Sequence, residues 1–319
     1  MKKILFSVLA LGSTLIYAQE AEVTTAPTPE TDTIKHWSIE GQNTIMLNQA
    51  AFSNWVGGGA NNVGWIAGTN YNLTYQKDKD LWENIVILGY GQTNTKGVGT
   101  RKTQDVINLS TNYGRKISEN WYASAGAGLI TQFAPGYDYS NSSSIISNVT
   151  STDGYKKTSS FMAPGYVTLG AGFTYKPNEN FTMTLRPANA RWTLVLDKDL
   201  QTAGNYGLKK DGDSSLFQFG FLATAQYKVQ LMPNISLTNT ASVFSNYLDH
   251  PERLVLSYGG VLNMKINKYV SSVITLDLLY DHNQIRKTQL KQTLGVGFAY
   301  NISNGVKRTE NTNNRTWKN

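Results

Sequence analysis

Apolar and polar residues alternate along most of this chain. From Trp37 onward, segments of roughly 9–14 residues place apolar side chains at every second position, with small or polar side chains between them. Successive side chains of a strand point to opposite faces, so this period predicts strands with one apolar and one polar face. Aromatic residues lie near one or both ends of the apolar face, and no long amphipathic helical period occurs. The clearest examples are "WIAGTNYNLTYQ", "NWYASAGAGLITQF", "VSSVITLDLLY" and "TLGVGFAYNI".

Two all-β architectures contain strands of this kind. In a soluble sandwich the apolar faces form the core, and strands average about 5–6 residues. In an outer-membrane barrel the apolar face meets lipid, strands run about 9–11 residues, and aromatic girdles mark both interfaces. The longer segments and their terminal aromatic residues favour the barrel. Two segments, "WENIVILGYG" and "ISLTNTASVF", alternate poorly, and the pattern alone does not assign their faces.

The spacing of the segments supports the same architecture. Connections after even-numbered segments are tight, as in "KDKD" and "ISEN", whereas those after odd-numbered segments are longer. Outer-membrane barrels alternate short periplasmic turns with long outer loops, and an even strand number leaves both termini in the periplasm. The sequence therefore predicts a transmembrane antiparallel up-and-down β-barrel of about 12 strands. The expected strands are residues 37–48, 64–76, 81–93, 102–115, 121–133, 162–175, 181–196, 216–228, 235–244, 254–266, 269–280 and 293–302.

The N-terminus predicts export. Lys2 and Lys3 precede the apolar run "ILFSVLALGSTLIYA", which resembles a secretory signal peptide cleaved before Gln19. This run is shorter than the roughly 20 apolar residues that a membrane-spanning helix needs. We expect a cleaved signal peptide, a flexible Pro/Thr/Glu-rich periplasmic lead-in, the barrel and a polar C-terminal tail, in a protein of the cell outer membrane. The corresponding ranges are residues 1–18, 19–36, 37–302 and 303–319.

Composition narrows the range of partners. The formal net charge is +7, but only 16% of residues are charged, and the Lys and Arg residues are scattered, so we expect no nucleic-acid binding. No Cys is present, which excludes disulfides and a lipoprotein anchor. The expected partners are outer-membrane lipid and lipopolysaccharide, the barrel assembly machinery during biogenesis, and a small polar solute. No cofactor is expected.

Several segments together resemble a known family. They are "FSNWVGGGANNVGWIAGTNYNLTY", "KTQDVINLSTNYGRKISENWYASAGAGLITQF", "FMAPGYVTLGAGFTYKPNENFTMTLRP" and "LLYDHN". Their combination resembles the domain of unknown function 3078 family, predicted outer-membrane β-barrels of Bacteroidota-type bacteria, over residues 36–300. The resemblance implies location and fold but no activity. In contrast to barrels that end on an aromatic residue, 19 residues follow Tyr300 here, so recognition during assembly would have to be internal.

Candidate catalytic chemistry is limited to three histidines. His250 in "NYLDHPER" and His282 in "LYDHNQIRK" each follow an Asp at an expected outer loop, and an Asp that orients a His is what a general base needs. Adjacent residues at a strand end point in opposite directions, however, so Asp281 is poorly placed to orient His282. His36 lies in the lead-in. We expect solvated histidines, no catalytic residue, and no transition-metal site, because Cys and paired His spacings are missing.

Charged residues on the polar faces are a better functional signal. In a wide pore they would set a field that selects solutes, whereas in a narrow barrel they would pair across the lumen and neutralise one another. A barrel of about 12 strands lies between filled eight-stranded barrels and open porins of about 16–18 strands. We expect internal pairing and a narrow path, with inward glycines leaving room for solute or a folded-in loop. The lumen-lining candidates are Glu40, Glu83, Arg186, Lys228, Lys265 and Asp277.

Three outer connections have distinctive compositions. The fifth, residues 134–161, carries Tyr137, Tyr139 and Tyr155 and could be a plug, a lid or a recognition loop. Such tyrosines can stack on sugars, but they also occur in the outer aromatic girdle. The seventh, residues 197–215, carries Lys198, Lys209 and Lys210, which either meet lipopolysaccharide phosphates or are simply solvated. In the first, the glycines at 57–59 lack the helix and the Lys-Ser/Thr pair of a phosphate-binding loop, so we expect a turn.

The sequence therefore predicts a non-enzymatic outer-membrane barrel, with a narrow channel or transporter for small polar solutes as the leading hypothesis. One alternative is a structural or accessory barrel of an outer-membrane complex that does not conduct. The other is a lipid-modifying or hydrolytic barrel enzyme. Conductance measurements separate the first two, and dependence of lipid turnover on His250 or His282 would identify the third.

Overall fold

The computed structural model describes residues 36–51, 60–138, 155–202, 205–282 and 284–304. The expected signal peptide, nearly all of the lead-in, the glycines at 57–59, Tyr139 and the tail from residue 305 lie outside these ranges. The chain divides into two units, Met1–Ile34 and Lys35–Asn319, and every described residue belongs to the second. Among the described residues, no helix is long and apolar enough to cross a membrane.

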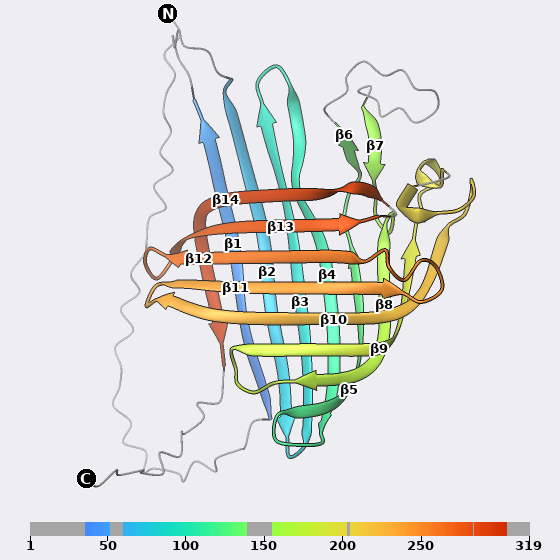
Figure 1. Ribbon diagram of the computed structural model, residues 1–319. Helices are drawn as coiled ribbons and strands as arrows, with labels where there is room; N and C mark the ends of the chain where they lie inside the picture. Colours follow the sequence, from blue (N-terminus) through green and yellow to red (C-terminus); the bar gives the residue numbers. More distant parts are fainter. Residues whose placement is uncertain (1–35, 52–59, 139–154, 203–204, 283, 305–319) are drawn as a thin grey trace, which may run out of the picture. The chain divides into compact units, whose positions relative to one another are not determined.

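Twelve antiparallel strands close into a barrel (Figure 1). Each barrel strand pairs with the next one along the chain, and β1 pairs with β14 to close the sheet. This up-and-down order confirms the predicted fold class. The barrel strands are β1 (Trp37–Ala50), β2 (Asn62–Lys77), β3 (Asp80–Thr95), β4 (Gly99–Lys116), β5 (Trp121–Thr131), β8 (Gly165–Tyr175), β9 (Phe181–Leu194), β10 (Ser215–Met232), β11 (Ile235–Asn246), β12 (Val255–Lys265), β13 (Val270–Asp281) and β14 (Ile285–Ser303).

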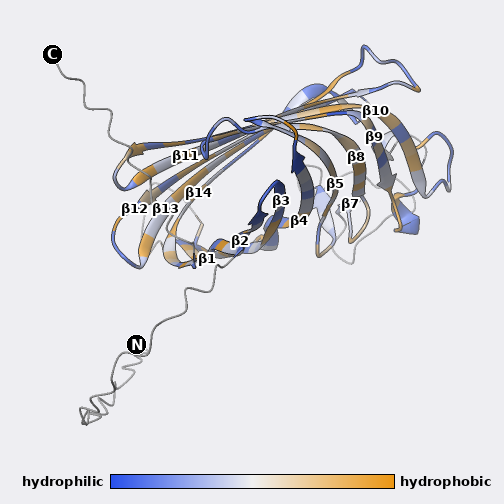
Figure 2. Ribbon diagram, turned by 90° about the horizontal axis from the view of Figure 1, so that it is seen from below, coloured by the Kyte–Doolittle hydropathy of each residue, from blue (hydrophilic) through white to orange (hydrophobic). Residues whose placement is uncertain are grey.

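Side-chain contacts show which face of the sheet lines the lumen. Lys291 of β14 donates a hydrogen bond to Gln104 of β4, although these strands are not neighbours in the sheet. Only the inner face of a closed barrel permits such a contact. The opposite face carries the exposed large apolar residues, among them Leu294 at 66% and Phe298 at 64% exposed. The alternation of apolar and polar residues along the strands is visible in Figure 2. An apolar exterior around a polar interior is the arrangement of a membrane barrel.

The same criterion assigns the two strands whose pattern was ambiguous. In β3, Trp82 lies outside with an exposed fraction of 41%, and Glu83 points into the lumen. In β11, Thr240 shares the inner face with Gln226 and Gly259, its partners on the neighbouring strands. Both strands carry apolar residues on the two faces, which is why the alternation alone did not assign them.

Aromatic residues form a belt at each end of the exterior. At the inner end, where β1 begins, β14 ends and the tight turns lie, the ring centroids of Trp37 and Tyr75 are 5.3 Å apart. At the outer end, those of Trp65 and Tyr90 are 5.9 Å apart. Trp65 and Tyr75 lie on one strand, ten residues apart. At about 3.3 Å per residue and a tilt of about 40°, the band between the belts is about 25 Å tall, as expected for a membrane barrel.

A polar group on the lipid-facing side of β1 and β2 is satisfied by its neighbours. Asn43 Nδ2 donates to Tyr71 Oη at 2.7 Å, and Thr69 Oγ1 donates to Asn43 Oδ1 at 2.7 Å. An amide without partners is costly in hydrocarbon, because no water is present to replace the missing bonds. These two hydrogen bonds therefore explain how the exterior accommodates an Asn.

The third outer connection is shorter than the sequence suggested. Strands β3 and β4 stay paired as far as Thr95 and Gly99, so only residues 96–98 connect them. Gly97 and Gly99 have φ values of 82° and 91°, and this left-handed conformation allows a tight hairpin turn.

The eleventh outer connection is also short. Strand β14 begins at Ile285, which pairs with Asp281, and residues 282–284 alone join it to β13. The segment from 285 to 292 is mostly polar and lacks a clear apolar face, so the alternation rule began the strand at residue 293. Backbone hydrogen bonding extends it regardless of side-chain polarity.

The fifth and seventh connections pack together at the outer end. The fifth contains a two-stranded sheet that the sequence did not predict, β6 (Gly136–Asp138) with β7 (Lys156–Ser159). The seventh contains two short 3-10 helices, η1 (Lys198–Leu200) and η2 (Asn205–Gly207). Between the two connections lies a buried apolar cluster formed by Ala163, Val195, Leu200 and Leu208.

An ion-pair group reinforces this contact. Lys157 Nζ lies 2.6 Å from Asp197 Oδ2 and 3.1 Å from Asp199 Oδ2. Partial burial disfavours the charged form of Lys157, but its bonds to the two carboxylates outweigh this effect and raise the pKa of the ammonium group. Burial likewise disfavours the charged form of Asp197, and the bond from Lys157 outweighs it and lowers the pKa of that carboxyl. The described part of the fifth connection is thus anchored to the seventh.

Candidate solute path through the barrel

The pairing register places all six of the charged lumen candidates on the inward-facing side of the sheet. They are Glu40 on β1, Glu83 on β3, Arg186 on β9, Lys228 on β10, Lys265 on β12 and Asp277 on β13. Their surroundings differ, and three classes can be distinguished.

Glu83 forms an ion pair. Its Oε1 lies 2.5 Å from Nζ of Lys176, and the two side chains are 18% and 24% exposed. Lys176 lies in the tight connection after β8, which is three strands from β3 in the sheet, so the pair crosses part of the lumen at the inner end. Sequence reasoning missed Lys176 because a turn residue has no strand parity to assign it to a face.

Arg186 lies flat against the lumen wall. Its Nη2 donates to Asn112 Oδ1 at 3.1 Å, three strands away on β4. The side chain passes over two glycines, since a Cβ added to Gly126 would lie 2.2 Å from Nη2 and one added to Gly170 would lie 2.9 Å from Cδ. These glycines provide the space in which a long cationic side chain binds the wall instead of projecting across the lumen.

The other four candidates face the lumen without a counter-ion. Glu40, Lys265 and Asp277 are exposed, and Lys228 is half-buried. Within the described ranges, none of the four forms an ion pair. The general pairing that we expected is therefore wrong for these residues. The positions beside them on the neighbouring strands are small or uncharged, as at Gly259 next to Asp277, except that Lys291 also lies beside Asp277 in the register without forming an ion pair. These exposed charges therefore meet solvent.

A bridge of side chains crosses the lumen near its outer end. Gln284 Nε2 donates to Tyr166 Oη at 2.8 Å. Gln284 lies in the connection between β13 and β14, and Tyr166 lies on β8, on the opposite side of the barrel. Arg191 on β9 lies 3.8 Å from Asp281 on β13, and these side chains are only 12% and 5% exposed. The Arg191 guanidinium also lies over the Tyr166 ring, 4.8 Å from its centroid, and 5.4 Å from that of Phe244. This group, termed the outer bridge, narrows the lumen.

Sequence parity does not find Arg191. Counting in twos from the inward Arg186 would place Arg191 on the lipid face. In the structure, Arg186 pairs with Leu222 and Asn189 with Gly220, so β9 has one more residue than β10 across this interval. Such a bulge reverses the parity beyond it. Pro187, which cannot donate a ladder hydrogen bond, is the sequence signal that would have indicated it.

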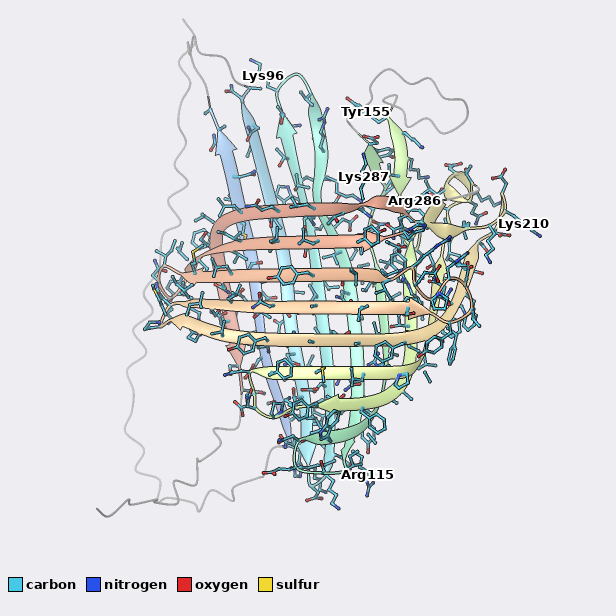
Figure 3. The ribbon with its side chains drawn as sticks, viewed as in Figure 1. Lys96, Arg115, Tyr155, Lys210, Arg286 and Lys287 are labelled. Atoms are coloured by element: carbon cyan, nitrogen blue, oxygen red, sulfur yellow. The ribbon has the colours of Figure 1, made fainter. Side chains whose placement is uncertain are left out.

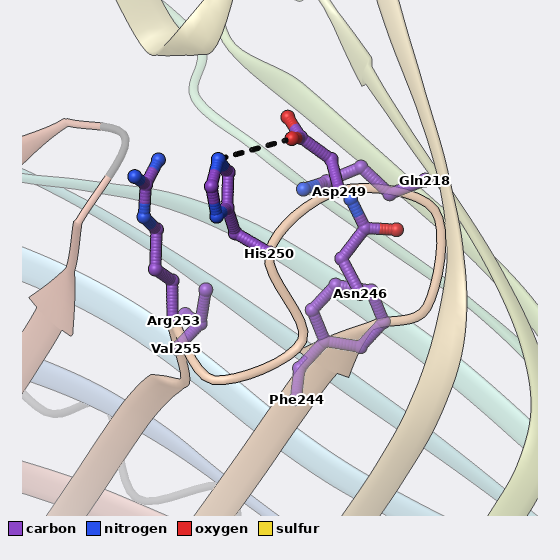
Figure 4. A pocket seen from close by; sticks show the side chains of 7 residues that line it. All are labelled: Gln218, Phe244, Asn246, Asp249, His250, Arg253 and Val255. Carbon is purple, nitrogen blue, oxygen red and sulfur yellow. Dashed lines mark ion pairs between the residues drawn. The ribbon is translucent and has the colours of Figure 1, made fainter.

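Two pockets at the outer end differ in free space. On the side of β10, β11 and β12, residues that include Gln218, Phe244 and His250 enclose a pocket of about 10 Å³ (Figure 4). On the side of β4, a pocket of about 260 Å³ lies between Gln104 and Lys291 of the lumen wall and the β6–β7 hairpin. A water molecule occupies about 30 Å³, so only the larger pocket admits a solute.

The described surroundings of His250 and His282 differ. His250 Nδ1 lies 2.9 Å from Glu252 Oε1. Its Nε2 lies 3.9 Å from Asp249 Oδ1 (Figure 4), so the ring is close to two carboxylates. His282 Nε2 is buried and has no hydrogen-bond partner among the described residues, and Asp281 turns instead to Arg191. The described residues also contain no group of three or more potential metal ligands from His, Cys, Asp and Glu.

The sequence profile of the family described as "Protein of unknown function (DUF3078)" matches residues 47–137. The chain is similar to this family over less than a third of its length. Within these residues the match confirms the resemblance seen in the sequence. The matched segment runs from the end of β1 to β6 and supplies Glu83, Asn112 and Gln104 to the lumen. A search of curated proteins finds no match to the chain.

Solved outer-membrane barrels resemble the chain at low identity. The COG4313 outer membrane channel from Pseudomonas putida F1 is 12% identical, with 84% of this chain and 94% of that chain covered and a TM-score of 0.36. The translocator domain of autotransporter NalP from Neisseria meningitidis is 12% identical, with 83% and 87% covered and a TM-score of 0.33. The NanC porin is 10% identical, with 81% of this chain and 98% of that chain covered and a TM-score of 0.33. The fold assignment rests on the strand pairing of this chain, and these structures carry no argument about its role.

Proposed function

We propose that this chain forms a narrow channel for small polar solutes in the outer membrane. The observation that carries the proposal is the set of exposed charges on the inner face, Glu40, Lys265 and Asp277, which have no ion-pair partner among the described residues. An ionised side chain without a partner is stable only where water solvates it. A lumen that holds such residues is therefore hydrated, and a hydrated lumen through a membrane is a path for polar solutes.

The cross-lumen contacts support a narrow path. Gln42 and Asn263 approach within 3.4 Å from β1 and β12, in addition to the Glu83–Lys176 pair and the outer bridge. These contacts divide the lumen at several levels, so we expect small solutes to pass and large ones to be excluded.

The exterior supports a position in the outer membrane, with lipid around the apolar band. Basic residues project at the outer end, including Lys210, Arg286 and Lys287 (Figure 3). Positive charge at this level is suited to lipopolysaccharide phosphates. We propose that the barrel assembly machinery folds this chain into the membrane during biogenesis. The proposal includes no catalytic step.

Solute-induced swelling of proteoliposomes tests the channel directly. Vesicles that contain the folded protein should swell in isosmotic glucose and should swell much more slowly in a trisaccharide such as raffinose. Vesicles prepared with heat-denatured protein are the control. If the folded protein produces no swelling in either sugar, the channel is refuted. A non-conducting accessory barrel, which the outer bridge also favours, would then be the better account.

A further inference from the structure

The larger outer pocket is lined mainly by residues with polar side chains. Its volume is about 260 Å³, and apart from Gly136 every lining residue carries a polar side chain. Gln104 and Lys291 come from the lumen face of β4 and β14, whereas Tyr137 and Ser159 come from the β6–β7 hairpin. This open space holds several water molecules, which suits a single small solute.

Two lysines, Lys102 and Lys291, line this pocket, and they differ in whether a carboxylate of the protein already pairs with them. Lys102 Nζ lies 2.7 Å from Asp105 Oδ2 and donates to the Ala134 carbonyl at 2.7 Å. Asp105 also accepts hydrogen bonds from the backbone N–H groups of Phe133 and Ala134, at 2.7 and 3.0 Å. Lys102 and Asp105 therefore neutralise each other and hold the start of the fifth connection.

Lys291 has a different environment. Its Nζ donates to the neutral amide oxygen of Gln104, its side chain is exposed, and it forms no ion pair within the described part of the chain. Asp277, its partner in the strand register, faces the lumen but does not line the pocket. The pocket thus presents one available positive charge, surrounded by amide and hydroxyl groups that can donate or accept hydrogen bonds.

We infer that this pocket binds a small hydroxylated anion, with Lys291 as the residue that recognises its carboxylate. The inference deepens the proposed function, because it gives the channel an entry site and a preferred solute charge. An ammonium group bound only to a neutral amide gains a stronger, charge-assisted hydrogen bond when a carboxylate arrives. The hydroxyl groups of the solute match the remaining polar lining. Neutral sugars lose the charged contact, and cationic ones are repelled.

Calorimetric titration of the detergent-solubilised, folded protein with sodium gluconate tests this site. Glucose, which has a similar size and no charge, is the solute control. The variant Lys291→Gln should weaken gluconate binding by about ten- to a hundredfold, the range for losing a hydrogen bond to a charged group. Asp277→Asn should strengthen binding, because it removes a negative charge near Lys291. Lys96→Gln makes the same charge change as Lys291→Gln at the exposed tip of the β3–β4 hairpin (Figure 3) and should have no effect.

The outcomes separate the site from the channel. Equal gluconate affinity in wild type and Lys291→Gln would overturn the inference, and so would binding of glucose as tight as that of gluconate. Absence of gluconate binding in a protein that passes glucose would overturn the site and leave the channel intact. Gluconate binding that depends on Lys291, in a protein that passes no solute, would support the site and refute the channel. Heat-modifiable migration on gels verifies that each variant is folded.

Discussion

The outer bridge makes a quantitative prediction about Arg191. Its distance to Asp281 is 3.8 Å, and both side chains are well shielded, at 12% and 5% exposed. With an effective dielectric constant of about 20, the Coulomb attraction at this distance is about 4 kcal/mol. Removing one partner of a shielded pair costs about 3–5 kcal/mol, because the other charge is left without compensation. Gln284 Nε2 remains 3.3 Å from Asp281 Oδ2 and offsets part of the loss. We therefore predict that Arg191→Ala lowers the free energy of unfolding by about 3 kcal/mol.

A double-mutant cycle isolates the pair. Arg191→Ala, Asp281→Ala and the double variant are unfolded by urea from lipid vesicles, with tryptophan fluorescence as the probe. The coupling energy should be about 2 kcal/mol or more, because the double variant no longer contains an uncompensated charge. The pair Lys209–Asp249 is a matched control, since its distance is 3.9 Å but its side chains are 68% and 51% exposed. Solvent screening should reduce its coupling to about 0–1 kcal/mol.

Two results would refute this reasoning. If the cycles for the shielded and exposed pairs gave the same coupling, burial would not strengthen the Arg191–Asp281 interaction. If Arg191→Ala left the stability unchanged, the bridge would not be formed in the membrane.

Two further predictions concern the lumen wall and the outer connections. Gly126→Ala places a Cβ 2.2 Å from a guanidinium nitrogen and 2.5 Å from a backbone oxygen, so it should lower the free energy of unfolding in urea by about 1–3 kcal/mol. Gly259→Ala is the control and should be nearly neutral, because the nearest atom lies 3.6 Å from the added Cβ. Equal effects of the two substitutions would contradict the packing of Arg186 over Gly126. The Lys157–Asp197 pair should stabilise the outer connections over a limited pH range. The contribution from the raised pKa of Lys157 is complete below about pH 10 and is lost as the pH rises through the pKa of Lys157 in the folded protein. The contribution from the lowered pKa of Asp197 is complete above about pH 4 and is lost as the pH falls through the pKa of Asp197 in the folded protein. The chain has no Cys, so Ser159→Cys can be labelled selectively with an environment-sensitive fluorophore. The fluorescence should be constant between these two pH limits and should change beyond them. Fluorescence unaffected by Lys157→Met would exclude the Lys157–Asp197 pair as the contact that holds this connection.

Most of the barrel is predictable from the sequence because lipid and water impose the alternation directly. Each exterior position such as Leu294 or Phe298 faces an apolar environment, and each position between them faces a polar one. This constraint acts at every residue of a strand, so it fixes the strands and their faces without knowledge of their partners. The inward glycines and the aromatic belts follow from the same constraint.

The outer bridge could not be predicted in the same way. The bulge at Pro187 reverses the parity of β9, and this reversal brings Arg191 into the lumen. The partner of Arg191, Asp281, becomes a neighbour only when the barrel closes. Interactions between strands that are distant in the sheet depend on closure and register, neither of which is encoded in the pattern of a single segment.

The β6–β7 hairpin has a similar origin. Its residues lack a clear alternation, and the hairpin is held by contacts to another connection, through Lys157 with Asp197 and Asp199. Glu83 was predicted to face the lumen, but its partner Lys176 comes from a turn. The alternation along a strand thus predicted which residues face the lumen, but it did not predict the residues that pair with them.

Single-channel recording in planar bilayers tests the central claim most directly. Purified, folded protein should produce stepwise currents in potassium chloride, and Arg191→Ala/Asp281→Ala, which removes the charged part of the outer bridge, should increase the size of the steps. A folded wild-type protein that inserts into the bilayer but gives no stepwise current would contradict the account.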